Sequence, residues 1–180
     1  LGAPLVARAA RRVAVAVLAQ GSLSDRPWGR TLAALAARGV SGQVNIDSGG
    51  KGYALVLDGG AVVGARSPLA SDAVARLALT AGLVTSTHVA QHSRLARDGG
   101  GDEVELLARI AGLSPDVTAR LRRRVIATQA IRSFALDDGQ FQVIEPATLP
   151  GFPDAAIDMR AVLLHGARTH LREAALRAAL

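Results

Sequence analysis

The sequence contains no cysteine, one methionine, one lysine and only five aromatic residues. Without cysteine the chain has neither disulfides nor thiolate chemistry, which fits a cytoplasmic location. With so few aromatic rings it lacks the stacking platform that proteins use to bind single-stranded nucleic acid. Long apolar runs are also missing, because Arg, Gly or Asp interrupts each one well short of a membrane span. We therefore expect a cytoplasmic protein without a membrane-spanning helix.

An apolar stretch at residues 13–19 follows several arginines, an order that imitates a secretory signal peptide. We expect no signal peptide here, because no small-residue cleavage site leads into a polar segment. The chain has 180 residues and starts at Leu1, so we expect a part cut from a longer protein. This length suits one domain with flanking segments, which can bury most of its apolar surface without disulfides.

The net charge of +6 comes almost wholly from arginine, because Lys51 is the only lysine. A GC-rich genome encodes arginine and alanine at such levels without selection for anion binding. The basic composition therefore gives only weak support to a nucleic-acid partner.

The most informative pattern in the chain is a repeat. Residues 72–83 recur thirty residues later as 102–113, with Asp, Val, Leu, Ala, Ala, Gly and Leu at matching positions. This spacing predicts one helix–turn–helix unit per copy, and such a unit cannot bury its apolar face alone. We expect the copies to pack on each other or on a neighbouring sheet. Ser71 or Asp72 is the expected N-cap of the first copy.

Short strands with glycine-rich turns lie on both sides of the repeat. Residues 40–46, 53–57 and 61–65 form three such strands, and they are too close in sequence for parallel pairing. They predict an antiparallel meander. A fourth strand, Phe141 to Ile144, follows the repeat. We predict that it pairs with the meander, because an isolated strand leaves its backbone donors and acceptors unpaired.

Two helices are predicted before the meander. Leu5, Val13 and Val17 lie on one face of a helix near the N-terminus. A second helix has Asp25 as its cap and Pro27 in its first turn, and it ends at Gly39.

Two further helices are predicted after the repeat. The first starts at Ser114 and Pro115 and runs to about Phe134. Its apolar stripe is Val117, Leu121, Val125, Thr128 and Ile131. The last helix is amphipathic and opens at Asp154 or Asp158.

These elements predict an α+β fold. It has a small antiparallel sheet, made of a three-strand meander and a returning fourth strand, with a bundle of about four helices inserted between strands three and four. Residues 1–20 are expected to form a lead-in helix or linker. Residues 21–170 form the domain, with the helical insert at about 70–135, and residues 171–180 end the last helix.

Five short motifs occur in a fixed order along the chain: Gly21 to Leu23, Ser41 to Ile46, Leu57 to Ala65, Gly139 to Val143 and Ile157 to Arg168. Their order resembles the PATAN family, the PatA N-terminal-like domain of bacterial signalling proteins. The resemblance covers about residues 21–168, and the chain departs from the family at Trp28-Gly29. It implies an α+β module that lies beside receiver and other regulatory domains and mediates protein–protein contacts. The resemblance implies no catalytic residue in this chain.

Histidine pairs are the only candidates for a metal site. His88 and His92 are four residues apart and share one side of a helix, but a third ligand is missing nearby. His165 and His170 are five apart and do not share a helical face. We expect no bound metal.

The segment Asp47 to Gly52 resembles a phosphate-binding loop only superficially. Gly52 follows Lys51 where Ser or Thr would meet magnesium, and a strand follows instead of a helix. A hairpin turn is the better interpretation. Ser, His and Asp occur without a nucleophile elbow or other triad signature, so we expect neither an enzyme nor a cofactor.

The repeat is also similar to helical pairs that bind cyclic dinucleotides at the front of secretion ATPases, whose units start with Arg-Leu-Gly. Here Ala78 follows Arg76-Leu77, and the second copy has Leu106-Leu107. We therefore favour a repeat that serves core packing.

The densest positive run contains Arg120, Arg122, Arg123 and Arg124. Arg120, Arg123 and Arg124 lie off the apolar stripe, so we expect them to be exposed and to form part of a partner-binding surface. No aromatic residue interleaves with them, which disfavours nucleic acid.

The function expected from the sequence is a non-catalytic regulatory or scaffolding module that binds a protein or a neighbouring domain of its own chain. A small-ligand or cyclic-dinucleotide sensor is the alternative, and a nucleic-acid-binding domain the third.

Overall fold

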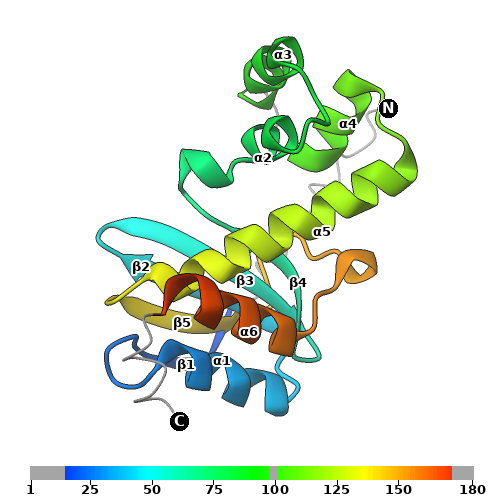
Figure 1. Ribbon diagram of the computed structural model, residues 1–180. Helices are drawn as coiled ribbons and strands as arrows, with labels where there is room; N and C mark the ends of the chain where they lie inside the picture. Colours follow the sequence, from blue (N-terminus) through cyan, green and yellow to red (C-terminus); the bar gives the residue numbers. More distant parts are fainter. Residues whose placement is uncertain (1–14, 98–100, 172–180) are drawn as a thin grey trace, which may run out of the picture.

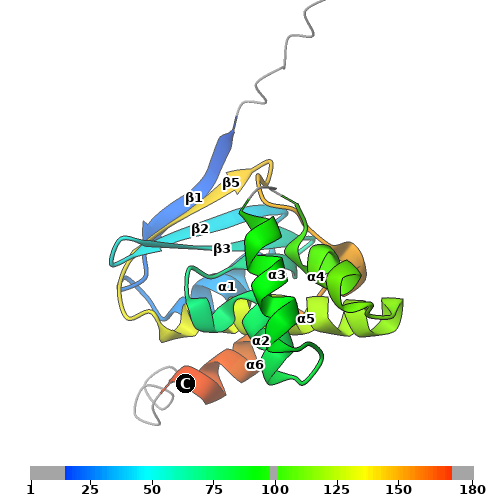
Figure 2. The ribbon, with the colours of Figure 1, turned by 90° about the horizontal axis from the view of Figure 1, so that it is seen from above.

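The computed structural model describes residues 15–97 and 101–171. A five-stranded antiparallel sheet forms one layer, and α1, α5 and α6 lie together on one side of it (Figure 1; Figure 2). The strands are β1 (Ala16–Ser22), β2 (Gly42–Ser48), β3 (Lys51–Asp58), β4 (Ala61–Arg66) and β5 (Gln140–Glu145). The helices are α1 (Trp28–Ala37), α2 (Val74–Thr80), α3 (Ser86–Ala96), α4 (Glu103–Ala111), α5 (Pro115–Arg132) and α6 (Met159–His170). Short 3₁₀ turns lie at η1 (Ala70–Asp72), η2 (Ser133–Ala135) and η3 (Pro153–Ala155).

The strands are ordered β1-β5-β2-β3-β4, and every neighbouring pair is antiparallel. β2, β3 and β4 form the predicted meander. Its first turn contains Gly49 and Gly50, with φ angles of 57° and 71°, the conformation that tight hairpins require. β5 returns after the helices and inserts between β1 and β2, with Val143 opposite Val44. The predicted pairing of residues 141–144 with the meander is therefore confirmed.

The α+β class and the antiparallel sheet are confirmed, but two details of the prediction are wrong. The sheet has five strands instead of four, and the helical insert lies between β4 and β5 instead of between strands three and four, because β1 precedes the meander. The additional strand is β1, most of which lies in the stretch 1–20 that the sequence predicts as a lead-in helix or linker. Its backbone pairs with β5, with Val17 opposite Ile144, and this pairing overrides the local helical pattern. The expected helical face at Leu5 and Val13, and the helix end at 172–180, lie outside the described residues.

The protein has two apolar cores, and each half of α5 contributes side chains to one of them. The larger one fills the space between the sheet and α1, α5 and α6, and it includes Ile126 and Ala130 of α5. The smaller one lies inside the group formed by α2, α3, α4 and α5, and it includes Leu121 and Val125 of α5. Figure 1 shows α5 running from the sheet layer to these helices. The insert is therefore joined to the sheet through one continuous helix.

The segment between β5 and η3 crosses the opposite face of the sheet. The side-chain carbonyl of Gln43 accepts hydrogen bonds from the backbone N–H groups of Thr148 and Leu149, at 2.9 and 2.8 Å. Gln43 is consequently buried although it alternates with core residues and points away from the helices. This contact fixes the chain path from β5 to α6.

The residues at which the helices begin contradict two predictions and confirm two others. Pro27 occupies the cap position of α1, while Asp25 accepts a hydrogen bond from the backbone of Ser22. Neither Ser71 nor Asp72 caps α2, because η1 occupies that stretch and Ala73 precedes the helix. Ser114 caps α5 as predicted, and of the two candidates for α6 it is Asp158, not Asp154, that caps the helix.

Gly166 of α6 provides a test of the packing between α6 and η2. A Cβ atom at this position would lie 2.4 Å from the ring of Phe134, so the ring would have to move. Alanine gains about 1 kcal/mol in helix propensity, whereas overpacking costs about 1–3 kcal/mol and grows with the overlap. We expect Gly166→Ala to lower the free energy of unfolding, as measured by urea denaturation.

Gly29 of α1 is the matched control, because a Cβ there would meet the same ring at an ordinary 3.4 Å. We expect Gly29→Ala to leave stability unchanged or raise it slightly. Equal stabilities of the two variants would contradict the close approach of α6 to Phe134.

Candidate functional site

The two repeat copies have closely similar helix ends. Gly82 and Gly112 end α2 and α4 with φ angles of 69° and 64°, in the left-handed region that favours glycine. The next backbone N–H, of Leu83 or Leu113, donates to the carbonyl of Ala78 or Ala108 at 3.0 Å in both copies. Each copy is the first helix of a pair, α2 with α3 and α4 with α5. The predicted helical unit and its packing against its neighbours are confirmed.

The aspartate that occurs at the same position in both repeat copies forms an ion pair with an arginine of α5 in each case. Asp72 accepts two hydrogen bonds from Arg132, at 2.9 and 2.7 Å, and two more from the hydroxyls of Ser67 and Ser71. Only 1% of Asp72 is exposed. Asp102 accepts from the first-turn N–H groups of α4 with one oxygen and from Arg122 with the other. The two arginines lie ten positions apart on the same helix.

The environment of Asp72 favours the ionised carboxylate. Burial by itself raises the pKa of Asp72, but the hydrogen bonds from Arg132, Ser67 and Ser71 outweigh burial and hold the pKa below its usual value. His170, at the end of α6, lies near the same pair. Burial lowers the pKa of His170, and the positive charge of Arg132 lowers it further. The neutral imidazole is therefore favoured beside this ion pair.

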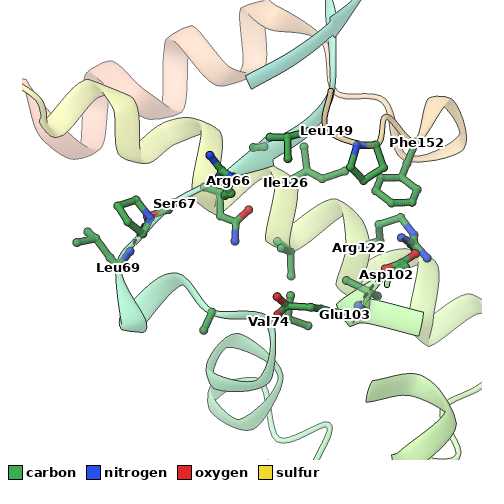
Figure 3. A pocket seen from close by; sticks show the side chains of 18 of the residues that line it. Arg66, Ser67, Leu69, Val74, Asp102, Glu103, Arg122, Ile126, Leu149 and Phe152 are labelled. Atoms are coloured by element: carbon green, nitrogen blue, oxygen red, sulfur yellow. Dashed lines mark hydrogen bonds and ion pairs between the residues drawn. The ribbon is translucent and has the colours of Figure 1, made fainter. Parts of the chain in front are cut away.

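A cavity of about 390 Å³ lies where the sheet layer meets the helical insert (Figure 3). Its walls come from the end of β4 and the chain leading to η1, the start of α4, the middle of α5 and residues 149–152. Apolar side chains line most of it, including Val74, Ile126 and Leu149. At one end Arg122 lies over the Phe152 ring, 4.1 Å from its centroid. The cavity has the size and character of a small-molecule site.

Arg66 and Glu103 line the cavity (Figure 3), and four other polar side chains that line it are already committed to structural contacts. Arg122 pairs with Asp102, the Ser67 hydroxyl donates to Asp72, and the Gln129 amide donates to the Asp72 carbonyl at 3.0 Å. The Asp72 carboxylate that accepts from Ser67 is also held by two hydrogen bonds from Arg132. The arrangement can hold a ligand by shape and apolar contact.

The two histidines of α3 have structural roles. The ring nitrogen Nδ1 of His88 accepts from the backbone of Thr85 in the capping box of α3, at 3.3 Å. His92 is buried and its Nε2 lies 3.1 Å from the carbonyl oxygen of Glu103. Among the residues that the structure describes, no three His, Cys, Asp or Glu side chains gather as a metal site would require.

The arginine run on α5 divides into one buried and three exposed residues. Arg120, Arg123 and Arg124 are exposed, as expected from their positions off the apolar stripe. Arg123 also donates to the carbonyl of Ala156 at 3.1 Å, which fixes η3 against α5. The partner-binding role of these three residues stays a prediction.

Arg122 is not among the residues predicted to be exposed, but its burial and its partners were not predicted either. It is 8% exposed and contacts Asp102, Glu105 and Phe152. Its spacing from Leu121 and Val125 is the signal that could have shown this, because the buried stripe of α5 is Thr118, Leu121, Arg122, Val125, Ile126, Gln129 and Ala130. Val117, Thr128 and Ile131 of the predicted stripe are only half-buried.

Comparison with known proteins gave no match to a protein family, to a curated protein or to a solved structure. Across residues 15–97 and 101–171, none of the helices combines the length and the apolar character that a bilayer crossing requires. The segment 47–52, considered above as a phosphate loop, is the β2–β3 hairpin turn.

The Asp72 ion pair gives a testable pH dependence. We expect Asp72→Asn to lower the free energy of unfolding at pH 7 by about 2–4 kcal/mol, because Arg132 then loses its charged partner. The folded-state pKa of Asp72 is depressed, so its contribution is present above the unfolded pKa of about 3.9 and is lost as pH falls through the folded pKa.

Urea denaturation between pH 7 and pH 2 measures this difference. The gap between wild type and Asp72→Asn should begin to narrow below about pH 4, where the unfolded chain takes up a proton that the folded protein still resists. It closes when the pH falls through the lower folded-state pKa. Asp137→Asn is the control, because Asp137 is exposed and such surface changes stay within about 0.5 kcal/mol. A gap that is constant down to pH 2 would argue against a charged Asp72.

Proposed function

We propose that this domain is a non-catalytic, cytoplasmic regulatory or scaffolding module that mediates protein–protein interaction within a larger bacterial signalling protein. Arg120, Arg123 and Arg124 of α5 form part of its recognition surface. The observation that carries this proposal is the separation of charges on one helix. Arg122 is buried and neutralised by Asp102, whereas its three neighbours extend into solvent. The resemblance of residues 21–168 to the PATAN family supports the same role.

The three exposed arginines share one helical face, because positions three and four apart lie side by side. No described acidic side chain forms an ion pair with them, so their charge is available to a partner. Exposed charges contribute only about 0–1 kcal/mol to folding. They act instead on association, where a positive face speeds the encounter with an acidic partner and added salt weakens it. The preferred partner is therefore a protein with an acidic surface.

A second candidate function is a small-ligand sensor, and the cavity between the sheet and the insert favours it. A ligand there would contact α4, α5 and the chain between β4 and η1 together. It would therefore bridge the two apolar cores and could change the position of the helical insert. The carboxylate of Asp102 and the guanidinium of Arg122 border this space.

Charge reversal on α5 tests the main proposal. We expect Arg120→Glu with Arg124→Glu to reduce the binding of partner proteins from the source organism's lysate by about tenfold or more, while stability changes by less than about 0.5 kcal/mol. Adding Arg123→Glu should weaken binding further, at the cost of the hydrogen bond to Ala156. Bound proteins are identified by mass spectrometry and their affinities measured by titration at two salt concentrations.

The control for the triple variant reverses three exposed arginines elsewhere, Arg38, Arg76 and Arg94, with the same change in net charge, and the control for the double variant reverses Arg38 and Arg76 alone. Both controls should keep partner binding close to wild type. Equal loss in control and test variants would remove the α5 face from the proposal. Loss of the bound material on nuclease treatment would favour a nucleic-acid partner instead.

Metals and cyclic dinucleotides provide a further test. We expect zinc, nickel and cyclic dinucleotides to leave the melting temperature unchanged, because His88 and His92 are held by Thr85 and Glu103. A ligand specific for the native state would add about 2.7 kcal/mol of stability at a hundredfold excess over its dissociation constant. A clear rise that is abolished by Arg76→Ala for a dinucleotide, or by the double alanine variant of the two histidines for a metal, would favour the sensor function.

A further inference from the structure

The sheet has one closed edge and one open edge. At the β4 edge, Val62 exchanges two backbone hydrogen bonds of 2.9 Å with Ile157, and the N–H of Phe152 donates to Val63 at 2.7 Å. At the other edge, β1 pairs with β5 alone, and no other segment among the described residues pairs with it. β1 therefore presents a row of backbone donors and acceptors that a further strand can use.

The open edge is apolar and carries no charge. Val15, Val17 and Leu18 are 50%, 51% and 46% exposed, and they are three of the five large hydrophobic side chains exposed among the described residues. No Asp, Glu, Lys, Arg or His occurs between residues 15 and 22. Edge strands are normally protected by lysine, proline or an inward-pointing charge. β1 has only a register shift between Val17 and Ala19, which bends a strand without adding charge.

We propose that β1 is a dimerisation edge, where it pairs antiparallel with β1 of a second copy of this chain. The two five-stranded sheets then form one continuous sheet across a twofold axis. An antiparallel pair of identical strands satisfies this symmetry by itself, because each copy offers the same residues to the other. Val17 and Leu18 of both copies then lie in the same contact region, where their side chains pack beside one another across the new strand pair.

The distribution of charge and the closed edge both favour a second copy as the occupant. Each copy carries a net charge of +6, so a stable contact between copies needs a surface without arginines, and residues 15–22 provide one. The arginine face of α5 stays clear of this contact, because α5 packs against β4 at the other edge of the sheet. The closed β4 edge stops further strand addition, so the assembly ends at two copies instead of growing into a fibre.

Analytical ultracentrifugation of the 180-residue chain tests the assembly. A short strand pair buries a small interface, so we expect a dissociation constant on the order of micromolar. Val17→Lys with Leu18→Lys should weaken dimerisation by about tenfold or more, because four like charges then meet at the contact. The control is Leu95→Lys with Leu164→Lys, which changes two equally exposed leucines on helices and should leave the dimer intact.

A distance measurement tests the geometry independently of these variants. The chain has no cysteine, so Gln20→Cys carries a single spin label at an exposed position of β1. A strand of seven residues is about 23 Å long, so two labelled strands paired antiparallel should give a Cα separation within that length. A label at Gln91→Cys on α3 should give a longer distance.

Three results would overturn the proposal. The first is a chain that stays monomeric up to about a hundredfold above the expected micromolar constant. The second is equal weakening by the control variant at Leu95 and Leu164. The third is a dimer whose labels at position 20 are far apart, which would show that another surface joins the copies.

Discussion

The buried carboxylate of Asp72 is the contact on which the arrangement of the two layers depends. It joins the turn after β4 to the C-terminal end of α5, so the chain that leaves the sheet and the helix that returns to it are held by one ion pair. Burying a charge is costly unless it is fully paired, and here two serines and an arginine complete its hydrogen bonding. Asp102 repeats this contact further along α5, with Arg122. The helical insert is therefore fixed at two points of a single helix.

Different faces of α5 consequently make different contacts. Leu121 and Ile126 contribute to separate apolar cores, Arg122 borders the cavity, and Arg120 and Arg124 remain in water. A helix that contacts both layers transmits displacement from one to the other, because packed interiors deform little. The proposed partner surface and the cavity thus lie on one rigid element, although they use different residues of it.

Local signals in the sequence predicted local structure well, and contacts between distant segments account for most errors. Gly49 and Gly50 identify their hairpin because the turn itself requires glycine, and Gly82 and Gly112 mark helix ends for the same reason. β1 lies mostly in a stretch whose local pattern predicts a helix or linker, because its strand character comes from pairing with β5, more than a hundred residues away. Asp72 and Asp102 are the same residue at matching repeat positions, yet only Asp102 caps a helix, because η1 holds Asp72 in a buried turn. The contacts of Arg122 could not be predicted, because its partners Asp102 and Phe152 come from other segments of the chain.

The position of β5 between β1 and β2 also determines the order in which the strands can pair during synthesis. The meander of β2, β3 and β4 can pair as soon as it leaves the ribosome, because its strands are joined by short turns. β1 cannot join it directly, since β5 lies between them and ends at Glu145, while β1 ends at Ser22. At about 5–20 residues per second, β1 waits on the order of 6–25 s for its partner strand. The first strand of the sheet to be synthesised is thus among the last to be paired, and its apolar side chains stay exposed to other molecules throughout that interval.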